Sequence, residues 1–125
     1  MGTVHFSDQE LMCKCGCGRQ EMHIDFLELL ETLREAYGSP MVLSSAYRCP
    51  SHNQAVSTTG TNGPHTTGRA VDVAIQGEEA YKLLALALDL GFTGIGIAQK
   101  GGGRFIHLDD LEPSMAGPRP RVWSY

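Results

Sequence analysis

The chain has 125 residues, of which 42% are hydrophobic, and a formal net charge of -4 at pH 7. This length suffices for one hydrophobic core but not for two, so we expect a single domain spanning residues 1–125. The negative charge argues against binding to nucleic-acid phosphates, and no apolar run approaches the roughly 20 residues that cross a bilayer, so we expect neither nucleic-acid binding nor membrane insertion.

The first half of the chain predicts a capped turn, a long amphipathic helix, a short buried strand and a brief helix. Apolar residues recur at helical spacing from Ile24 to Tyr37, and the Gly-Ser-Pro that follows ends this helix. The other three elements are expected at residues 7–10, 41–45 and 50–56. A loop rich in threonine and glycine then leads through Pro64 to His65.

The second half predicts a second helix, two strands and a tail. The helix is expected over Glu78–Leu90, with Gly91 at its end. Two apolar strands, Gly94–Ala98 and Arg104–Leu108, are joined by a glycine-rich connection typical of a hairpin. Residues 113–125 are expected to form an extended C-terminal tail. These elements predict an α+β fold with a small, mostly antiparallel sheet flanked by helices.

Two histidines and one aspartate are the most informative residues of the chain. His65, Asp72 and His107 supply the ligands that a catalytic zinc ion uses while it keeps one position open for water. Asp72 lies between valines on a predicted core strand, where a carboxylate is costly unless it has a partner such as a cation. Two adjacent strands could hold all three side chains at one ion. The alternative is a solvated aspartate on a surface strand and histidines that bind no metal.

Four cysteines permit several interpretations. Cys13, Cys15 and Cys17 are crowded together, and Cys49 is distant in sequence. This pattern differs from the two spaced ligand pairs of a typical structural zinc site. A disulfide from Cys49 to the cluster would need an oxidising compartment, for which the chain carries no secretion signal. Free thiols packed under a loop are therefore favoured, and the role and redox state of the four residues stay open.

Several short motifs resemble, in combination, the zinc D-Ala-D-Ala carboxypeptidase and L-alanyl-D-glutamate endopeptidase family. They are Ser45-Ala-Tyr47-Arg48, His52-Asn53, His65-x-x-Gly68-x-Ala70-x-Asp72, Gly94-Ile-Gly96 and His107-x-Asp109. The resemblance runs from about Phe6 to Asp109. It implies the fold shared with the hedgehog signalling domain, one zinc ion held by His65, Asp72 and His107, and the peptide stem of bacterial peptidoglycan as substrate.

The resemblance also matches Arg48 to the arginine that engages substrate and stabilises the oxyanion. A guanidinium suits either task, because it can grip a carboxylate with paired hydrogen bonds or stabilise charge on a carbonyl oxygen. Taken alone, Arg48 would be read as part of a surface salt bridge.

The general base is the residue that the resemblance does not supply. Many family members carry Glu or Asp three residues before the last histidine ligand, where this chain has Arg104. Asp109 lies two residues after His107, on the same face of the strand, and is either the replacement base or a group that orients His107.

A second departure precedes the first ligand. Relatives often have Ser-x-His there, whereas this chain has Gly63-Pro64-His65 and lacks the supporting hydroxyl. The residues that could replace this hydroxyl are Thr61, Thr66 and Thr67. The remaining histidines, His5, His23 and His52, are read as non-ligands, with His52 near the cleft.

The sequence thus predicts a zinc metallopeptidase that hydrolyses stem-peptide bonds, of D-Ala-D-Ala carboxypeptidase or L-Ala-D-Glu endopeptidase type, with zinc-bound water as nucleophile. The alternatives are a non-catalytic, zinc-stabilised cell-wall or protein binding module and, more remotely, a thiol protein. The chain's size and its lack of a signal-peptide pattern suggest a monomeric phage-type lysin or virion component, made in the cytoplasm and acting at the cell wall.

Overall fold

The computed structural model describes residues 2–125. The helices are α1 (Asp8–Leu11), α2 (Ile24–Tyr37), α3 (Pro50–Val56), the 3-10 helix η1 (Pro64–Thr67), α4 (Gly77–Leu90) and α5 (Pro113–Ala116). The strands are β1 (Val42–Ser45), β2 (Ala70–Ala74), β3 (Gly94–Ala98), β4 (Phe105–Asp109) and β5 (Arg121–Ser124). Among residues 2–125 no helix is long and apolar enough to cross a bilayer.

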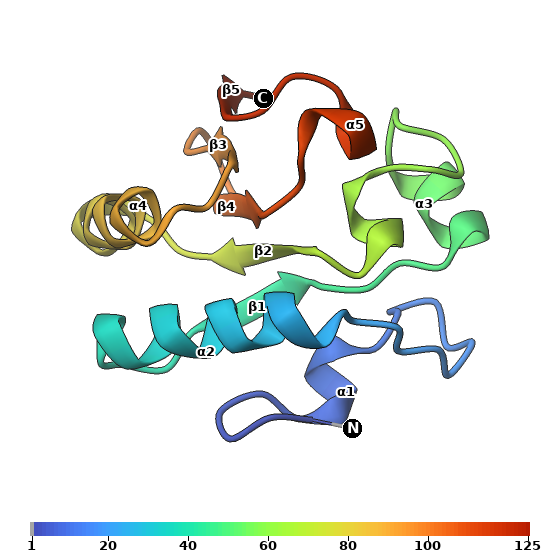
Figure 1. The fold of residues 1–125 in the computed structure, drawn as a ribbon, viewed down its shortest axis with the longest axis horizontal. Coiled ribbons are helices and arrows are strands. Elements are labelled where there is room, and N and C mark those ends of the chain that lie inside the picture. The colour runs from blue at the N-terminus through green and yellow to red at the C-terminus, as the bar shows by residue number, and fades with distance from the viewer. Residues whose placement is uncertain (1) are drawn as a thin grey trace.

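The five strands form one sheet in the order β1-β2-β4-β3-β5 (Figure 1). The pairs β1–β2, β2–β4 and β3–β4 are antiparallel, whereas β5 runs parallel to β3. The predicted α+β class with flanking helices is confirmed. The sheet is mixed rather than mostly antiparallel, because residues 121–124 return along β3 and add a parallel edge strand. The segment predicted as a tail, residues 113–125, therefore contains α5 and β5.

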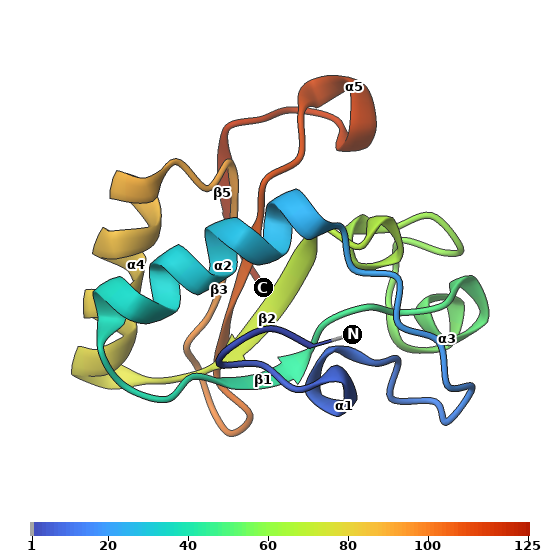
Figure 2. The same ribbon diagram turned by 60° about the horizontal axis from the view of Figure 1, so that its bottom comes forward.

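One face of the sheet packs against α2 and α4. Val71 on β2 is paired with Leu108 on β4, which is paired in turn with Ile95 on β3. All three side chains are buried in the main hydrophobic cluster together with residues of both helices. Figure 2 shows α2 passing across the sheet with α4 beside it. Because side chains alternate along a strand, the intervening residues of β2 and β4 point to the opposite face, away from this core.

Most element boundaries agree with those predicted. α2, α3 and β3 begin and end at the predicted residues, and α4 begins one residue early, at Gly77. β1 begins at Val42, and β4 extends to Asp109 because that residue pairs with both Ala70 and Gly94. The predicted capped turn is α1, which Ser7 and Glu10 close with a capping box.

Gly68 connects η1 to the start of α2. Its backbone has a φ of +76°, in the left-handed region. Its carbonyl accepts a hydrogen bond of 2.8 Å from the backbone N–H of His23, and a Cβ at this position would collide with the backbone carbonyl of Glu21. Gly38, at the end of α2, has a similar φ of +79° but open space around its Cα.

We expect Gly68→Ala to lower the free energy of unfolding clearly more than Gly38→Ala does. Both substitutions carry the left-handed backbone cost of about 1–2 kcal/mol, but only Gly68→Ala also forces two backbone segments apart. Urea denaturation of the two variants measures this difference. Equal losses would contradict the close packing of η1 against the start of α2.

Candidate metal centre

The strand register places two of the predicted ligands directly opposite each other. Asp72 on β2 is paired with His107 on β4. His65 comes from η1, just before β2, and its ring lies edge-on to that of His107 with centroids 5.1 Å apart. All three side chains are buried, and the ligand atoms lie within 4.8 Å of one another. The fold therefore brings together the three residues that the sequence singled out.

The outer nitrogen of each imidazole is held by a hydrogen-bond acceptor. His65 Nδ1 donates to the backbone carbonyl of Ala46 at 2.8 Å, and His107 Nε2 donates to the Asp109 carboxylate at 2.8 Å. These bonds fix the tautomers, so in the neutral rings the inner nitrogens carry lone pairs. A metal-binding histidine is oriented in the same way by its outer partner.

The inner nitrogens both face one oxygen of Asp72. Asp72 Oδ1 lies 3.2 Å from His65 Nε2 and 3.1 Å from His107 Nδ1. Three acceptors that converge in this way need a positive charge between them. In a tetrahedral zinc site, ligand atoms about 2.0–2.1 Å from the metal lie about 3.3 Å from one another. The spacing and the donor types at this site therefore fit a zinc ion.

The pKa values of Asp72 and His107 are both shifted because the carboxylates and imidazoles lie so close together. Burial acts to raise the pKa of Asp72, but the hydrogen bonds that His107 and His65 donate to it when their rings are protonated outweigh burial and lower it. Burial acts to lower the pKa of His107, but hydrogen bonds to Asp109 and Asp72 raise it. The surrounding carboxylates thus favour positive charge at this position.

Asp109 lies behind His107 and is fully buried. Its carboxylate accepts hydrogen bonds from His107, from the backbone N–H of Leu111 at 3.3 Å, and from Arg119 Nε and Nη2 at 3.0 and 2.9 Å. Burial acts to raise the pKa of Asp109, but the bonds from His107 and Arg119 lower it to about 2. The carboxylate is therefore ionised, and both oxygens are occupied by donors.

Two glycines of β3 make room for this arrangement. A Cβ on Gly94 would collide with the Asp109 carboxylate, and one on Gly96 would lie 2.6 Å from Trp123 Nε1. The Gly94-Ile-Gly96 motif is thus explained by close packing on the face of the sheet that carries the candidate metal centre.

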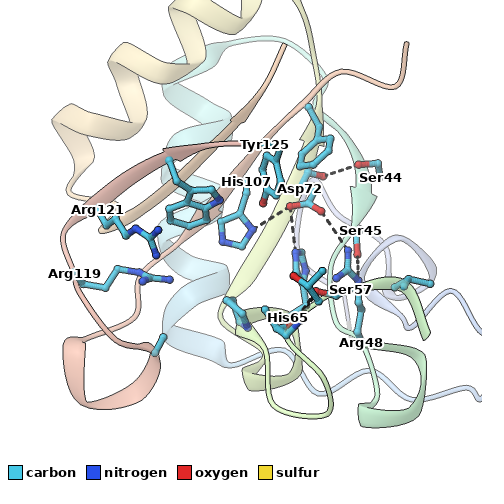
Figure 3. Close-up of a pocket in the computed structure, with 17 residues that line it drawn as sticks. Ser44, Ser45, Arg48, Ser57, His65, Asp72, His107, Arg119, Arg121 and Tyr125 are labelled. Carbon is cyan, nitrogen blue, oxygen red and sulfur yellow. Dashed lines mark hydrogen bonds and ion pairs between the residues drawn. The ribbon is translucent and has the colours of Figure 1, made fainter. Parts of the chain in front are cut away.

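A cleft of about 740 Å³ opens over the candidate metal centre. Figure 3 shows Arg119 and Arg121 on one side of the His65, Asp72 and His107 cluster, with Ser45 and Arg48 on the other. Among the described residues that line the cleft, Asp72 is the only carboxylate. Apart from that residue, the charged side chains of the lining are arginines.

The Arg48 guanidinium contacts Oδ2 of Asp72, the carboxylate oxygen that does not face the two histidines. Its Nε donates to Ser45 Oγ at 3.0 Å, its Nη1 to Asn53 Oδ1 at 3.2 Å and its Nη2 to Asp72 Oδ2 at 3.4 Å. The guanidinium is mostly buried, with 16% of the side chain exposed. Arg48 is therefore oriented by neighbours within the cleft, unlike the surface salt bridge considered as its alternative.

The sequence profile of the peptidase M15 family matches residues 4–109, more than four fifths of the chain. The chain belongs to the peptidase M15 family. No curated protein sequence matches it. Membership supports a metallopeptidase, for which His65, Asp72 and His107 are the candidate zinc ligands.

In this M15 domain, Arg104 and two of the threonines near His65 make contacts outside the candidate metal centre. Arg104, which stands where relatives carry an acid, donates a hydrogen bond of 2.9 Å from Nε to the carbonyl of Gly101 and does not line the cleft. Thr66 and Thr67 donate to the carbonyls of Gly63 and Pro64, so they support the η1 backbone and not the ring of His65.

The other three histidines lie apart from the metal centre. The His5 ring bonds the Glu31 carboxylate at 2.6 Å, and the His23 side chain accepts from the Asp25 backbone at the start of α2. His52 lies on α3 and does not line the cleft.

Sequence reasoning missed the contribution of the C-terminal strand. Trp123 packs against His107 with ring centroids 5.1 Å apart, and the guanidinium carbons of Arg119 and Arg121 lie 5.3 and 5.4 Å from the Trp123 ring centroid. The spacing of Arg121, Trp123 and Tyr125 by two residues was a signal, since alternate residues of a strand share a face. It could not reveal that this strand pairs with β3.

We expect Arg119→Met to destabilise the domain strongly and Arg121→Met to have little effect. Only 4% of the Arg119 side chain and none of Asp109 is exposed, so removing the guanidinium leaves a buried carboxylate without its two hydrogen bonds from Arg119. Breaking such a pair costs about 3–5 kcal/mol, whereas Arg121 is exposed. Chemical denaturation of the two variants tests this expectation, and equal stabilities would refute it.

Proposed function

We propose that this M15 domain is a zinc peptidase that hydrolyses peptide bonds in the stem peptide of bacterial peptidoglycan. The observation that carries the proposal is the convergence of His65 Nε2, Asp72 Oδ1 and His107 Nδ1 in one cleft, with both imidazole tautomers fixed from outside. A zinc ion at this position would supply a Lewis acid and lower the pKa of bound water toward about 7.

The residues around the site would bind and orient the substrate. Arg48 is preorganised by Ser45 and Asn53, so its guanidinium is available at little entropic cost to a peptide carboxylate or to a carbonyl oxygen that gains negative charge. Arg121 lies on the opposite side of the cleft. A cleft flanked by arginines suits a peptide with free carboxylates, as stem peptides have.

Asp109 is proposed as a positioning residue, and the role of general base is not assigned to it. Its oxygens already accept bonds from His107, Leu111 and Arg119, and it does not line the cleft. It would instead fix the His107 ring and increase its basicity toward the metal.

The first test measures release of new amino groups from purified peptidoglycan and from defined stem peptides. We expect release by zinc-loaded protein, at least a hundredfold loss after chelation or in His65→Ala, and recovery on adding zinc to chelated wild type. His52→Ala, a histidine outside the cleft, should retain activity. Undiminished hydrolysis by metal-free protein would overturn the proposal, and the mass of the product identifies the bond.

The role of Asp109 is tested separately with Asp109→Asn. A positioning role predicts a 10–100-fold weaker zinc affinity, with most activity restored at saturating zinc. A base predicts unchanged zinc affinity and a loss of kcat that zinc does not restore. Zinc titration followed by kinetics at saturation separates the two roles, and circular dichroism checks that the variant is folded.

A zinc-stabilised binding module is the second candidate function. It is favoured by one observation: among the described cleft residues no carboxylate other than Asp72 is available as a base. Such a module would bind stem peptides with zinc present but release no amino groups. Calorimetric binding without turnover, by folded protein with zinc confirmed at the His65 site, would favour this function over the peptidase.

A further inference from the structure

The four cysteines gather into one cluster outside the cleft. Cys13, Cys15 and Cys17 follow α1, and Cys49 immediately precedes α3. Although up to 36 positions separate them in sequence, the four sulfur atoms all lie within 4.8 Å of one another. Cys13 and Cys49 are buried, Cys15 and Cys17 are exposed, and all four are free thiols. None of these residues has a part in the proposed hydrolysis.

The distances between the sulfur atoms correspond to one metal ion. Cys13 Sγ lies 3.4 Å from Cys15 Sγ, which lies 3.7 Å from Cys49 Sγ. In a tetrahedral zinc site with Zn–S bonds of about 2.3 Å, neighbouring sulfurs are about 3.8 Å apart. A disulfide needs about 2.05 Å. A cluster of several irons would need a wider cage of sulfurs than this one.

The backbone around the cluster holds the sulfurs in place. The N–H of Cys13 donates to the carbonyl of Arg19 at 2.9 Å and closes the loop between them. Gly16 and Gly18, with φ of +87° and +80°, turn the chain inside this loop. The N–H of Cys49 donates to Cys13 Sγ at 3.3 Å, a contact that stabilises a thiolate.

We propose that Cys13, Cys15, Cys17 and Cys49 bind a second zinc ion, separate from the one at the candidate metal centre. Each thiol would lose its proton on binding, and four thiolates would close the coordination shell and leave no position for substrate. The role is therefore structural. The ion would tie the loop after α1 to Cys49, the residue next to Arg48, and so hold the cleft wall that carries this arginine.

The sequence pattern alone disfavoured this site. Cys-x-Cys-x-Cys places its ligands closer together than the usual pairs do. In the structure the turns at Gly16 and Gly18 fold this short segment back on itself. Cys49, four residues after the end of β1, lies at the same point. The unusual spacing is thus compatible with a four-ligand site in which one loop supplies three cysteines and Cys49 supplies the fourth.

The test counts zinc in protein purified under reducing conditions and exchanged into metal-free buffer. We expect two zinc ions per wild-type chain and one in His65→Ala. The double variant Cys15→Ser/Cys17→Ser should also hold one, and because both cysteines are exposed, the buried core is unchanged. The matched control is His5→Ala, which alters the group formed by His5, Glu31 and Glu35 and should retain two zinc ions.

Cobalt(II) substitution identifies the ligands at each site. Sulfur-to-cobalt charge-transfer absorption should appear in wild type and in His65→Ala and be lost in Cys15→Ser/Cys17→Ser, because the His65 site has no sulfur ligand. Thiol titration should find the four cysteines protected until a chelator is added.

Three outcomes would overturn the proposal: a single zinc that His65→Ala abolishes, iron in place of zinc at the cysteines, or a mass deficit showing that thiols have joined as disulfides in the reduced preparation. None of them bears on the peptidase proposal, since the two sites share no ligand.

Discussion

The ionised carboxylate of Asp72 in the middle of the sheet is the constraint on which the rest of the structure depends. It lies on β2 between valines that belong to the hydrophobic core, with only 6% of the residue exposed. An isolated charge at such a position is costly. The fold offsets this cost by pairing Asp72 with His107, bringing in His65 from η1 and placing Arg48 over the second carboxylate oxygen.

A chain of charged hydrogen bonds extends from this point to the C-terminal segment. His107 donates to Asp109, which Arg119 holds with two bonds. Gly94 leaves space for this carboxylate, and Gly96 leaves space for the Trp123 ring. The C-terminal segment beyond the family match therefore supports the His107 imidazole, which would bind the metal, and it also lines one side of the cleft. Loss of any link would leave a buried polar group without its partner, which is why the links are interdependent.

Local patterns predicted helices α2 to α4, strands β1 to β4 and the three candidate ligands because these patterns reflect burial within each element. The seven-residue spacing of His65 and Asp72 matched a loop that enters a strand, and alternation placed His107 and Asp109 on one face. The same patterns left Asp109 open as a base or as a group that orients His107, since nothing near it in sequence indicated that Arg119 would be its partner. They could not decide whether Cys49 joins the Cys13 cluster, because that contact depends on how β1 lies beside the loop after α1.

The sequence by itself thus determined the fold class, the ligand chemistry and the family resemblance, all of which depend on residue type and short spacing. Only the tertiary structure decided which side chains meet: Arg119 with Asp109, Trp123 with His107, and four sulfurs around one point. The physical reason is that strand order and the parallel pairing of β5 with β3 arise from contacts between distant segments, and periodicity within a segment carries no information about them.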